Sequence, residues 1–164
     1  LPMLDGDRGH LVARRANYKK DNLEAPEIIY NPDLKEYYLF VSYDPLMTTY
    51  NVRVGRSDKA EGPFIDYFGK ELKDTTNNFP ILTAPYRFKN HSGWAGTAHC
   101  AVFTSDDGQY FMAHQGRLSP QNQMMDLHVR QVFFTKDGWP VVSPERYAGS
   151  NPREFSAADL VGEW

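Results

Sequence analysis

The fold is decided by a stretch that the chain uses twice, "IIYNPDLKEYYLF" (28–40) and "AVFTSDDGQYFMA" (101–113). Each copy has a short apolar run, a polar turn and a second run of aromatic and aliphatic residues, which is the pattern of a β-hairpin. The copies align at an offset of 73 residues, and "NVRVGRSDKAEGPF" (51–64) continues over "HVRQVFFTKDGWPV" (128–141) at an offset of 77. The sequence therefore contains an internal repeat of about 75 residues.

The rest of the chain has the punctuation of an all-β protein. Proline and glycine interrupt it throughout, and no stretch before residue 150 has a sustained apolar period of 3.6 residues. Runs of β-branched and aromatic residues predict strands at 10–15, 27–30, 37–43, 50–57, 63–67, 99–103, 110–115, 127–134 and 139–143. A repeated meander of four strands is the sequence form of propeller blades.

The repeat predicts that the chain supplies about two and a half blades of an all-β propeller. We interpret the chain as four parts: the end of a preceding blade, one blade, the next blade and a connection onward, at residues 1–22, 23–70, 95–148 and 149–164. A propeller closes with at least four blades, so the remaining blades are expected from a missing segment or from another chain. The alternative is a self-contained β-sandwich of eight strands.

Composition excludes several classes of function. The net charge is −3 and the Lys and Arg residues are scattered, so a nucleic-acid partner is not expected. The longest apolar runs have four or five residues, far short of the roughly 20 that cross a bilayer. The single cysteine, Cys100, rules out an internal disulfide. Aromatic residues make up 14% of the chain, which suits either strands or surfaces that stack on sugars.

Two ionisable residues stand near the starts of inner strands in the two copies of the repeat. Glu24, in "EAPEIIY" (24–30), precedes the first inner strand, and the offset of 73 residues places Thr97, Ala98 and His99 opposite Glu24, Ala25 and Pro26. In a propeller the first strand of each blade lines the central channel, and its starting end opens into a pocket. We therefore expect a glutamate and a histidine to enter one cavity from adjacent blades.

Four motifs, in this order, resemble the later blades of glycoside hydrolase family 43, closest to its arabinanases: "LEAPEIIYN", "TYNVRVGRSDKAEGPFID", "GTAHCAVF" and "HVRQVFFTKDGWPVVSPERYAG". The resemblance implies a five-bladed β-propeller that cleaves α-1,5-linked L-arabinofuranose in arabinan by an inverting mechanism. The glutamate of the family's "EAP" motif is the general acid, and it falls on Glu24. Secretion to an extracellular or periplasmic space is expected, because arabinan is an extracellular polymer, although no signal segment is visible in "LPMLDGDRGH" (1–10).

The resemblance also implies a cation site and two further carboxylates. His99 matches a histidine that contacts a metal ion, usually taken as calcium, surrounded mostly by water. The family's general base and a second aspartate belong to earlier inner strands, and we assign neither role to Asp5, Asp7 or Asp21. The chain alone is therefore expected to lack arabinanase activity.

The remaining candidates are aromatic and basic. Trp94, Tyr43 and Tyr50 lie in or beside predicted loops, where a flat ring stacks on a sugar face. Three arginines alternate with apolar residues on the third strands: Arg53, Arg56 and Arg130. The repeat places Arg53 over Arg130, and paired positions in two blades favour a structural role such as bridging blades. The histidines other than His99 show no zinc-ligand spacing with Cys100. The alternatives to an arabinanase are an exo-acting arabinofuranosidase or β-xylosidase on the same scaffold, and a non-catalytic carbohydrate-binding propeller.

Overall fold

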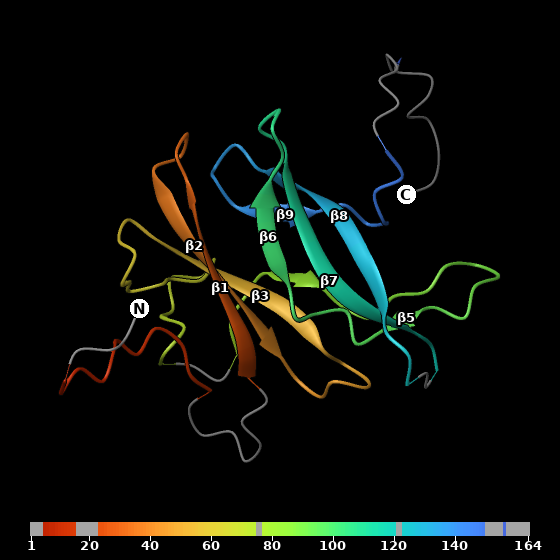
Figure 1. Ribbon diagram of the computed structural model, residues 1–164, viewed down its shortest axis with the longest axis horizontal. Helices are drawn as coiled ribbons and strands as arrows, with labels where there is room; N and C mark the ends of the chain where they lie inside the picture. Colours follow the sequence, from red (N-terminus) through yellow and green to blue (C-terminus); the bar gives the residue numbers. More distant parts are fainter. Residues whose placement is uncertain (1–4, 16–22, 75–76, 121–122, 150–155, 157–164) are drawn as a thin grey trace.

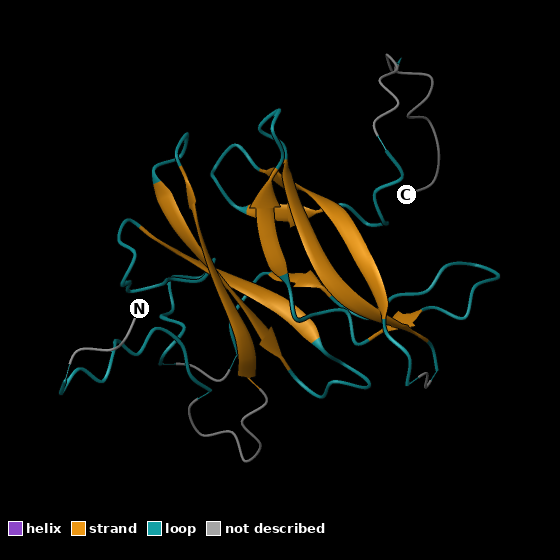
Figure 2. Ribbon diagram, in the orientation of Figure 1, coloured by secondary structure: helices purple, strands orange, loops and turns teal. Residues whose placement is uncertain are grey.

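The computed structural model describes residues 5–15, 23–74, 77–120, 123–149 and 156. These residues form two antiparallel sheets that lie side by side, joined by loops (Figures 1 and 2). Within the described ranges no helix is long and apolar enough to cross a membrane. The secondary structure there is all β, as the repeat predicted.

The first sheet is a meander in chain order. Its strands are β1 (Leu23–Asn31), β2 (Glu36–Tyr43), β3 (Asn51–Ser57) and β4 (Ile81–Thr83). The turn between β1 and β2 is held by Asn31, whose side-chain oxygen accepts hydrogen bonds from the N–H groups of Asp33 and Leu34. This is the turn chemistry that an Asn before a short polar loop predicts.

The second sheet repeats the meander with a divided first strand. Its strands are β5 (Trp94–Ala95), β6 (Ala101–Thr104), β7 (Tyr110–Leu118), β8 (Asp126–Phe134) and β9 (Pro140–Val142). Both β5 and β6 pair with β7, at its end and its beginning respectively. Residues 96–100 interrupt this inner edge between them.

The core is built around β2, which is buried on both faces. Tyr38 and Phe40 point toward the second sheet and belong to a cluster with Val102, Met112 and Trp139. The alternate residues of β2 pack on the opposite side against a loop of the first sheet; this cluster is Leu39, Val41, Tyr43, Phe64 and Leu72. Burial of each large apolar side chain contributes about 1.5–3 kcal/mol, so the two-sided packing of β2 fixes both the sheet pair and the loop.

The fourth strand of the first sheet differs from the prediction. Residues 63–67 form only isolated bridges, from Ile65 to Arg56 and Glu71, and the strand instead lies at Ile81–Thr83. The cause is Asp66, whose buried carboxylate accepts hydrogen bonds from the N–H groups of Phe68 and Lys70 and turns the chain away from the sheet. The predicted strand at 10–15 is also wrong, because these residues are irregular. Residues 16–22 and most of the proposed connection at 149–164 lie outside the described residues.

Candidate active site

Glu24 sits where the regular pairing of β1 breaks. Its backbone partner on β2 is Ser42, and the register shifts between Glu24 and Glu27. Ala25, inside this bulge, has a φ of 50°, which residues with a side chain rarely adopt. Bulges of this kind re-aim a side chain and occur beside active sites, and here the side chain of Glu24 is exposed.

The Glu24 carboxylate is held by a buried tyrosine. Tyr50, directly before β3, is 1% exposed, and its hydroxyl donates a hydrogen bond of 2.6 Å to Oε1 of Glu24. Burial raises the pKa of Tyr50 well above its usual value, and the hydrogen bond to the Glu24 carboxylate raises that pKa further. Tyr50 therefore stays protonated and keeps donating to Glu24 across the neutral pH range.

His99 reaches the same place from the second sheet. It lies in the interruption between β5 and β6, has a φ of 59° and donates its backbone N–H to Oγ of Ser42 at 2.9 Å. Ser42 is also the backbone partner of Glu24. The structure thus brings Glu24 and His99 together on either side of Ser42, while their chemical roles stay predictions.

The surroundings of His99 fit a cation only if water supplies most of its ligands. Its imidazole is exposed and makes no hydrogen bond to another described residue. Within the described ranges no three His, Cys, Asp or Glu side chains gather as a metal site. A cleft of about 390 Å³ opens beside His99, and Asp126 is among its lining residues. Hard cations prefer oxygen ligands, so a cation at this single imidazole would take most of its ligands from water.

The prediction that Tyr43 and Tyr50 stack on a sugar is wrong, because both rings are buried. Tyr43 is 0% exposed, its hydroxyl donates to Oδ1 of Asn78, and the Arg53 guanidinium lies 4.6 Å from its ring centroid. Tyr50 presents its hydroxyl to Glu24 and no ring face to solvent. The loop positions of both residues in the sequence gave no sign of this burial.

Trp94 occupies β5, and its buried indole has close protein neighbours. It is 7% exposed, its ring centroid lies 4.5 Å from that of His128, and the Arg146 guanidinium is 4.9 Å from its ring. A sugar that stacked on Trp94 would have to replace Arg146. The stacking role of Trp94 stays a prediction.

The side chains of Arg53 and Arg56 make structural contacts, and Arg56 bridges the two sheets. Arg53 donates to Asn51 and Asp44, and the same Asp44 carboxylate forms an ion pair with Arg15, in the segment assigned to the preceding blade. Burial alone would raise the pKa of Asp44, yet hydrogen bonds from Asn51 and Arg15 hold that pKa below its usual value. Arg56 does bridge, because it donates to the carbonyl oxygen of Asp137 in the second sheet at 2.7 Å.

Sequence reasoning missed Ser42, which joins the two candidate residues. The one available signal was its chemistry: Ser42 is a small polar residue within the otherwise apolar and aromatic run "LFVSY" (39–43). It is fully buried, and buried hydroxyls require a hydrogen-bond partner. That requirement predicts a contact but not its partner, which comes from a segment 57 residues away.

Comparison with known proteins gives consistent matches. The family model described as glycosyl hydrolases family 43 matches residues 4–140. The extracellular endo-α-(1→5)-L-arabinanase 2 of Bacillus subtilis (strain 168) is 31% identical over 162 residues, which cover 87% of this chain and 34% of the relative. The chain spans about a third of the length of the curated relatives it matches.

Solved structures agree with this match. The endo-1,5-α-L-arabinanase of Thermotoga petrophila RKU-1, in complex with TRIS, superposes with a TM-score of 0.79 at 29% identity over 86% of this chain and 34% of its own. The α-L-arabinanase of Cellvibrio cellulosa, complexed with arabinohexaose, gives 0.63 at 27% identity over 75% of this chain and 37% of its own. These likenesses confirm the five-bladed β-propeller, of which this chain supplies part, and the sandwich alternative is wrong.

Proposed function

The chain belongs to glycosyl hydrolases family 43, and we propose that the protein containing it hydrolyses the α-1,5 linkages of arabinan with inversion, using Glu24 as the general acid. The observation that carries this proposal is the 2.6 Å hydrogen bond from Tyr50 to Glu24 at the broken start of β1. It holds an exposed carboxyl group at the start of an inner strand, where a propeller opens its channel.

The hydrogen bond determines which oxygen of Glu24 acts. Tyr50 donates to Oε1, so the proton given to the departing sugar oxygen is carried by Oε2. Proton transfer by a positioned carboxyl group of this kind contributes about 10²–10⁴ in rate. Inversion also needs a second carboxylate, about 6.5–9.5 Å away, that activates water. We assign that base and a further aspartate to blades outside this sequence.

A cation beside His99 is the second element of the proposal. His99 would hold it through one imidazole nitrogen, with water as the other ligands, in the cleft described above. When bound, the ion supplies positive charge near the reacting carboxyl groups. Elemental analysis of the purified protein tests this point: His99→Ala is expected to lose the ion, and equal metal content in both proteins would reject the site.

The substrate is tested by product analysis on linear arabinan. We expect a ladder of arabino-oligosaccharides, detected by chromatography. Each newly formed reducing end is expected to have the inverted anomeric configuration, detected by NMR. One short product would favour an exo-acting arabinofuranosidase, release of xylose from xylo-oligosaccharides would favour the β-xylosidase, and binding without products would favour the carbohydrate-binding propeller. The 164-residue chain, assayed alone, is expected to be inactive.

The proposed location follows from the relatives. The curated proteins that the chain resembles are described as extracellular. We assign the same location to this protein, where a polymeric substrate is accessible. Detection of the protein in the culture medium of its source, against a cytosolic marker, tests the assignment.

A further inference from the structure

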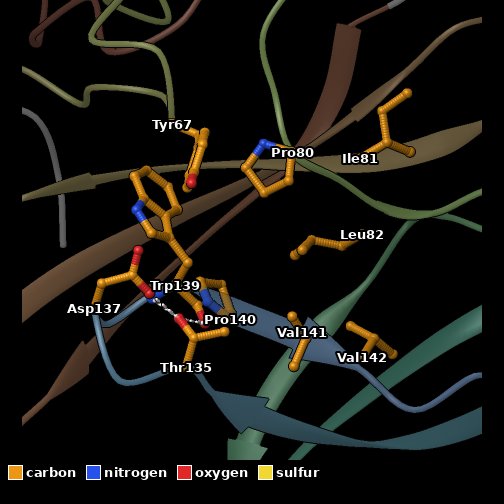
Figure 3. A pocket seen from close by; sticks show the side chains of 10 residues that line it. All are labelled: Tyr67, Pro80, Ile81, Leu82, Thr135, Asp137, Trp139, Pro140, Val141 and Val142. Atoms are coloured by element: carbon orange, nitrogen blue, oxygen red, sulfur yellow. Dashed lines mark hydrogen bonds between the residues drawn. The ribbon is translucent and has the colours of Figure 1, made fainter.

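A second cleft lies between the outer strands of the two sheets, away from Glu24. It has a volume of about 390 Å³ and is lined by β4, β9 and the loops that precede them (Figure 3). In the first sheet β4 is three strands from β1, which carries Glu24. Its size falls within the range of about 300–1,000 Å³ that small-molecule sites occupy.

Aromatic rings form one side of this cleft. Tyr67 is 54% exposed, and its ring centroid lies 5.5 Å from that of Trp139 at an interplanar angle of 64°. Figure 3 shows these two rings on one side and Ile81 and Leu82 on the other. The exposed ring of Tyr67 is the platform that the C–H face of a sugar requires.

The platform is held in place before any ligand binds. The N–H of Tyr67 donates to the carbonyl oxygen of Phe79 at 2.8 Å, and the neighbouring Asp66 carboxylate ties the start of the loop to Asn78. Trp139 is covered by the Arg56 guanidinium, 4.5 Å from its ring centroid. The rings are therefore already ordered in the free protein, so ligand binding loses little additional side-chain entropy.

One carboxylate stands at the rim of the cleft. Asp137 accepts a hydrogen bond of 2.6 Å from the hydroxyl of Thr135, drawn as a dashed line in Figure 3. That bond is the main reason that the pKa of Asp137 lies below its usual value. The group is ionised at neutral pH and is exposed, so it can accept further hydrogen bonds from a ligand.

This combination selects among ligand classes. An anionic ligand would face the Asp137 carboxylate, while the Arg56 side chain is already engaged by Trp139 and a carbonyl oxygen. A wholly apolar partner would remove water from Asp137 without a replacement, which costs free energy. A neutral sugar suits both the aromatic ring and the carboxylate, because its C–H face covers the ring while its hydroxyls donate hydrogen bonds to the carboxylate.

We propose that the cleft between β4 and β9 binds a neutral saccharide chain, with Tyr67 as the stacking platform and Asp137 as the hydroxyl acceptor. Asp137 is the single carboxylate among the described residues that line it, so the cleft holds a polymer without cleaving it. The site goes beyond the proposed hydrolysis, and only the choice of arabinan as first probe rests on the proposed function.

The test is affinity electrophoresis of the protein that contains this chain, in gels with linear arabinan or with xylan. The protein carries Glu24→Gln so that the polymer is not degraded during the run. Adding Tyr67→Ala is expected to weaken retention about fivefold to tenfold on at least one polymer. Tyr30→Ala is the matched control, because Tyr30 is 47% exposed and also packs on another ring, that of Tyr37, but lies outside the cleft.

Two further measurements keep the outcome clear. Asp137→Asn, a surface change that keeps an acceptor for Thr135, is expected to weaken retention about threefold. If thermal melts show that Tyr67→Ala does not fold, the retention of Asp137→Asn becomes the test of the site. With Glu24 intact, hydrolysis of arabinotriose is expected to be unchanged by Tyr67→Ala. Retention that neither Tyr67 nor Asp137 affects on either polymer would overturn the saccharide site. Absence of any arabinan hydrolysis would reject the proposed function alone.

Discussion

The inner edges of the two sheets break one residue apart in the register of the repeat, and they do so in different ways. In the first sheet β1 stays continuous through a bulge at Ala25, with a φ of 50°. In the second sheet the edge divides into β5 and β6, and His99 between them has a φ of 59°. Left-handed conformations outside glycine cost about 1–3 kcal/mol and cluster at functional sites.

The difference between these edges lies in how each candidate side chain is supported. Glu24 is fixed through its own carboxylate by the hydroxyl of Tyr50. His99 is fixed through its backbone by Ser42, which leaves its ring exposed. A group proposed to transfer a proton benefits from a fixed oxygen, whereas the exposed ring of His99 is left free to move. A similar backbone irregularity in each sheet thus holds the Glu24 carboxylate in place but leaves the His99 ring unrestrained by hydrogen bonds to other described residues.

The largest effect is expected from removing the acid on the first edge. Glu24→Gln should lower the hydrolysis of arabinan about 10³-fold, because Gln cannot donate a carboxylic proton. Steady-state rates on linear arabinan measure this. An aryl arabinofuranoside with an activated leaving group is the control, since its departure needs little protonation and its rate should fall far less. An equal loss on both substrates would contradict proton donation by Glu24.

Acid is expected to destabilise the second sheet through a buried histidine pair. His114 and His128 face each other across β7 and β8, and burial, with a smaller contribution from Arg130, lowers the pKa of each to about 4. Because these values lie below the ordinary 6.5, the unfolded chain takes up protons first as the pH falls. The stability that each neutral histidine contributes is therefore fully present above pH 6.5 and is lost as the pH falls toward 4, by roughly 3 kcal/mol for each histidine.

Denaturant unfolding at pH 7 and at pH 4.5 measures this loss. The neighbours that face His128 are of both signs, Arg146 and Arg130 against Glu145 and Asp126, so burial is the decisive term. The variant His128→Leu removes one titrating ring and should make the free energy of unfolding less dependent on pH. An unchanged pH dependence in this variant would show that other groups cause the acid loss.

A smaller effect is expected from the support of Glu24. Tyr50→Phe keeps the buried ring but removes the hydroxyl that donates to Oε1. We expect arabinan hydrolysis to fall about tenfold, equivalent to about 1.4 kcal/mol, while the aryl arabinofuranoside with the activated leaving group is little affected. If both substrates lost activity equally, Tyr50 would be a packing residue and not a positioning residue.

The smallest effect is expected from replacing alanine by glycine at two equivalent positions of the repeat, Ala25 and Ala98. Ala25→Gly should change the free energy of unfolding by less than about 0.5 kcal/mol, because glycine adopts a positive φ without cost. Ala98→Gly should destabilise by about 1 kcal/mol, because Ala98 is fully buried and has an ordinary φ. Chemical denaturation of both variants measures the difference, and equal losses would argue against strain at Ala25.

The hairpin strands were predictable because their signal is local. The runs at 28–40 and 101–113 carry alternating apolar residues around polar turns, and they became β1 with β2 and β6 with β7. The fourth strand of the first sheet was not predictable, because Asp66 diverts the chain through hydrogen bonds to residues as far along as Asn78 and Phe79. A strand at 63–67 has suitable propensity, but this network of a buried carboxylate overrides it.

The sequence by itself determined the all-β class, the repeat, and the places of Glu24 and His99 near the starts of two inner strands, because period, turn residues and spacing are properties of neighbouring residues. Only the tertiary structure decided that Tyr43 is buried under Arg53, that Tyr50 supports Glu24, and that Ser42 joins the two sheets. Those contacts join segments 10 to 57 residues apart. Burial and hydrogen-bond partners at that range depend on how the sheets pack, which no local pattern encodes.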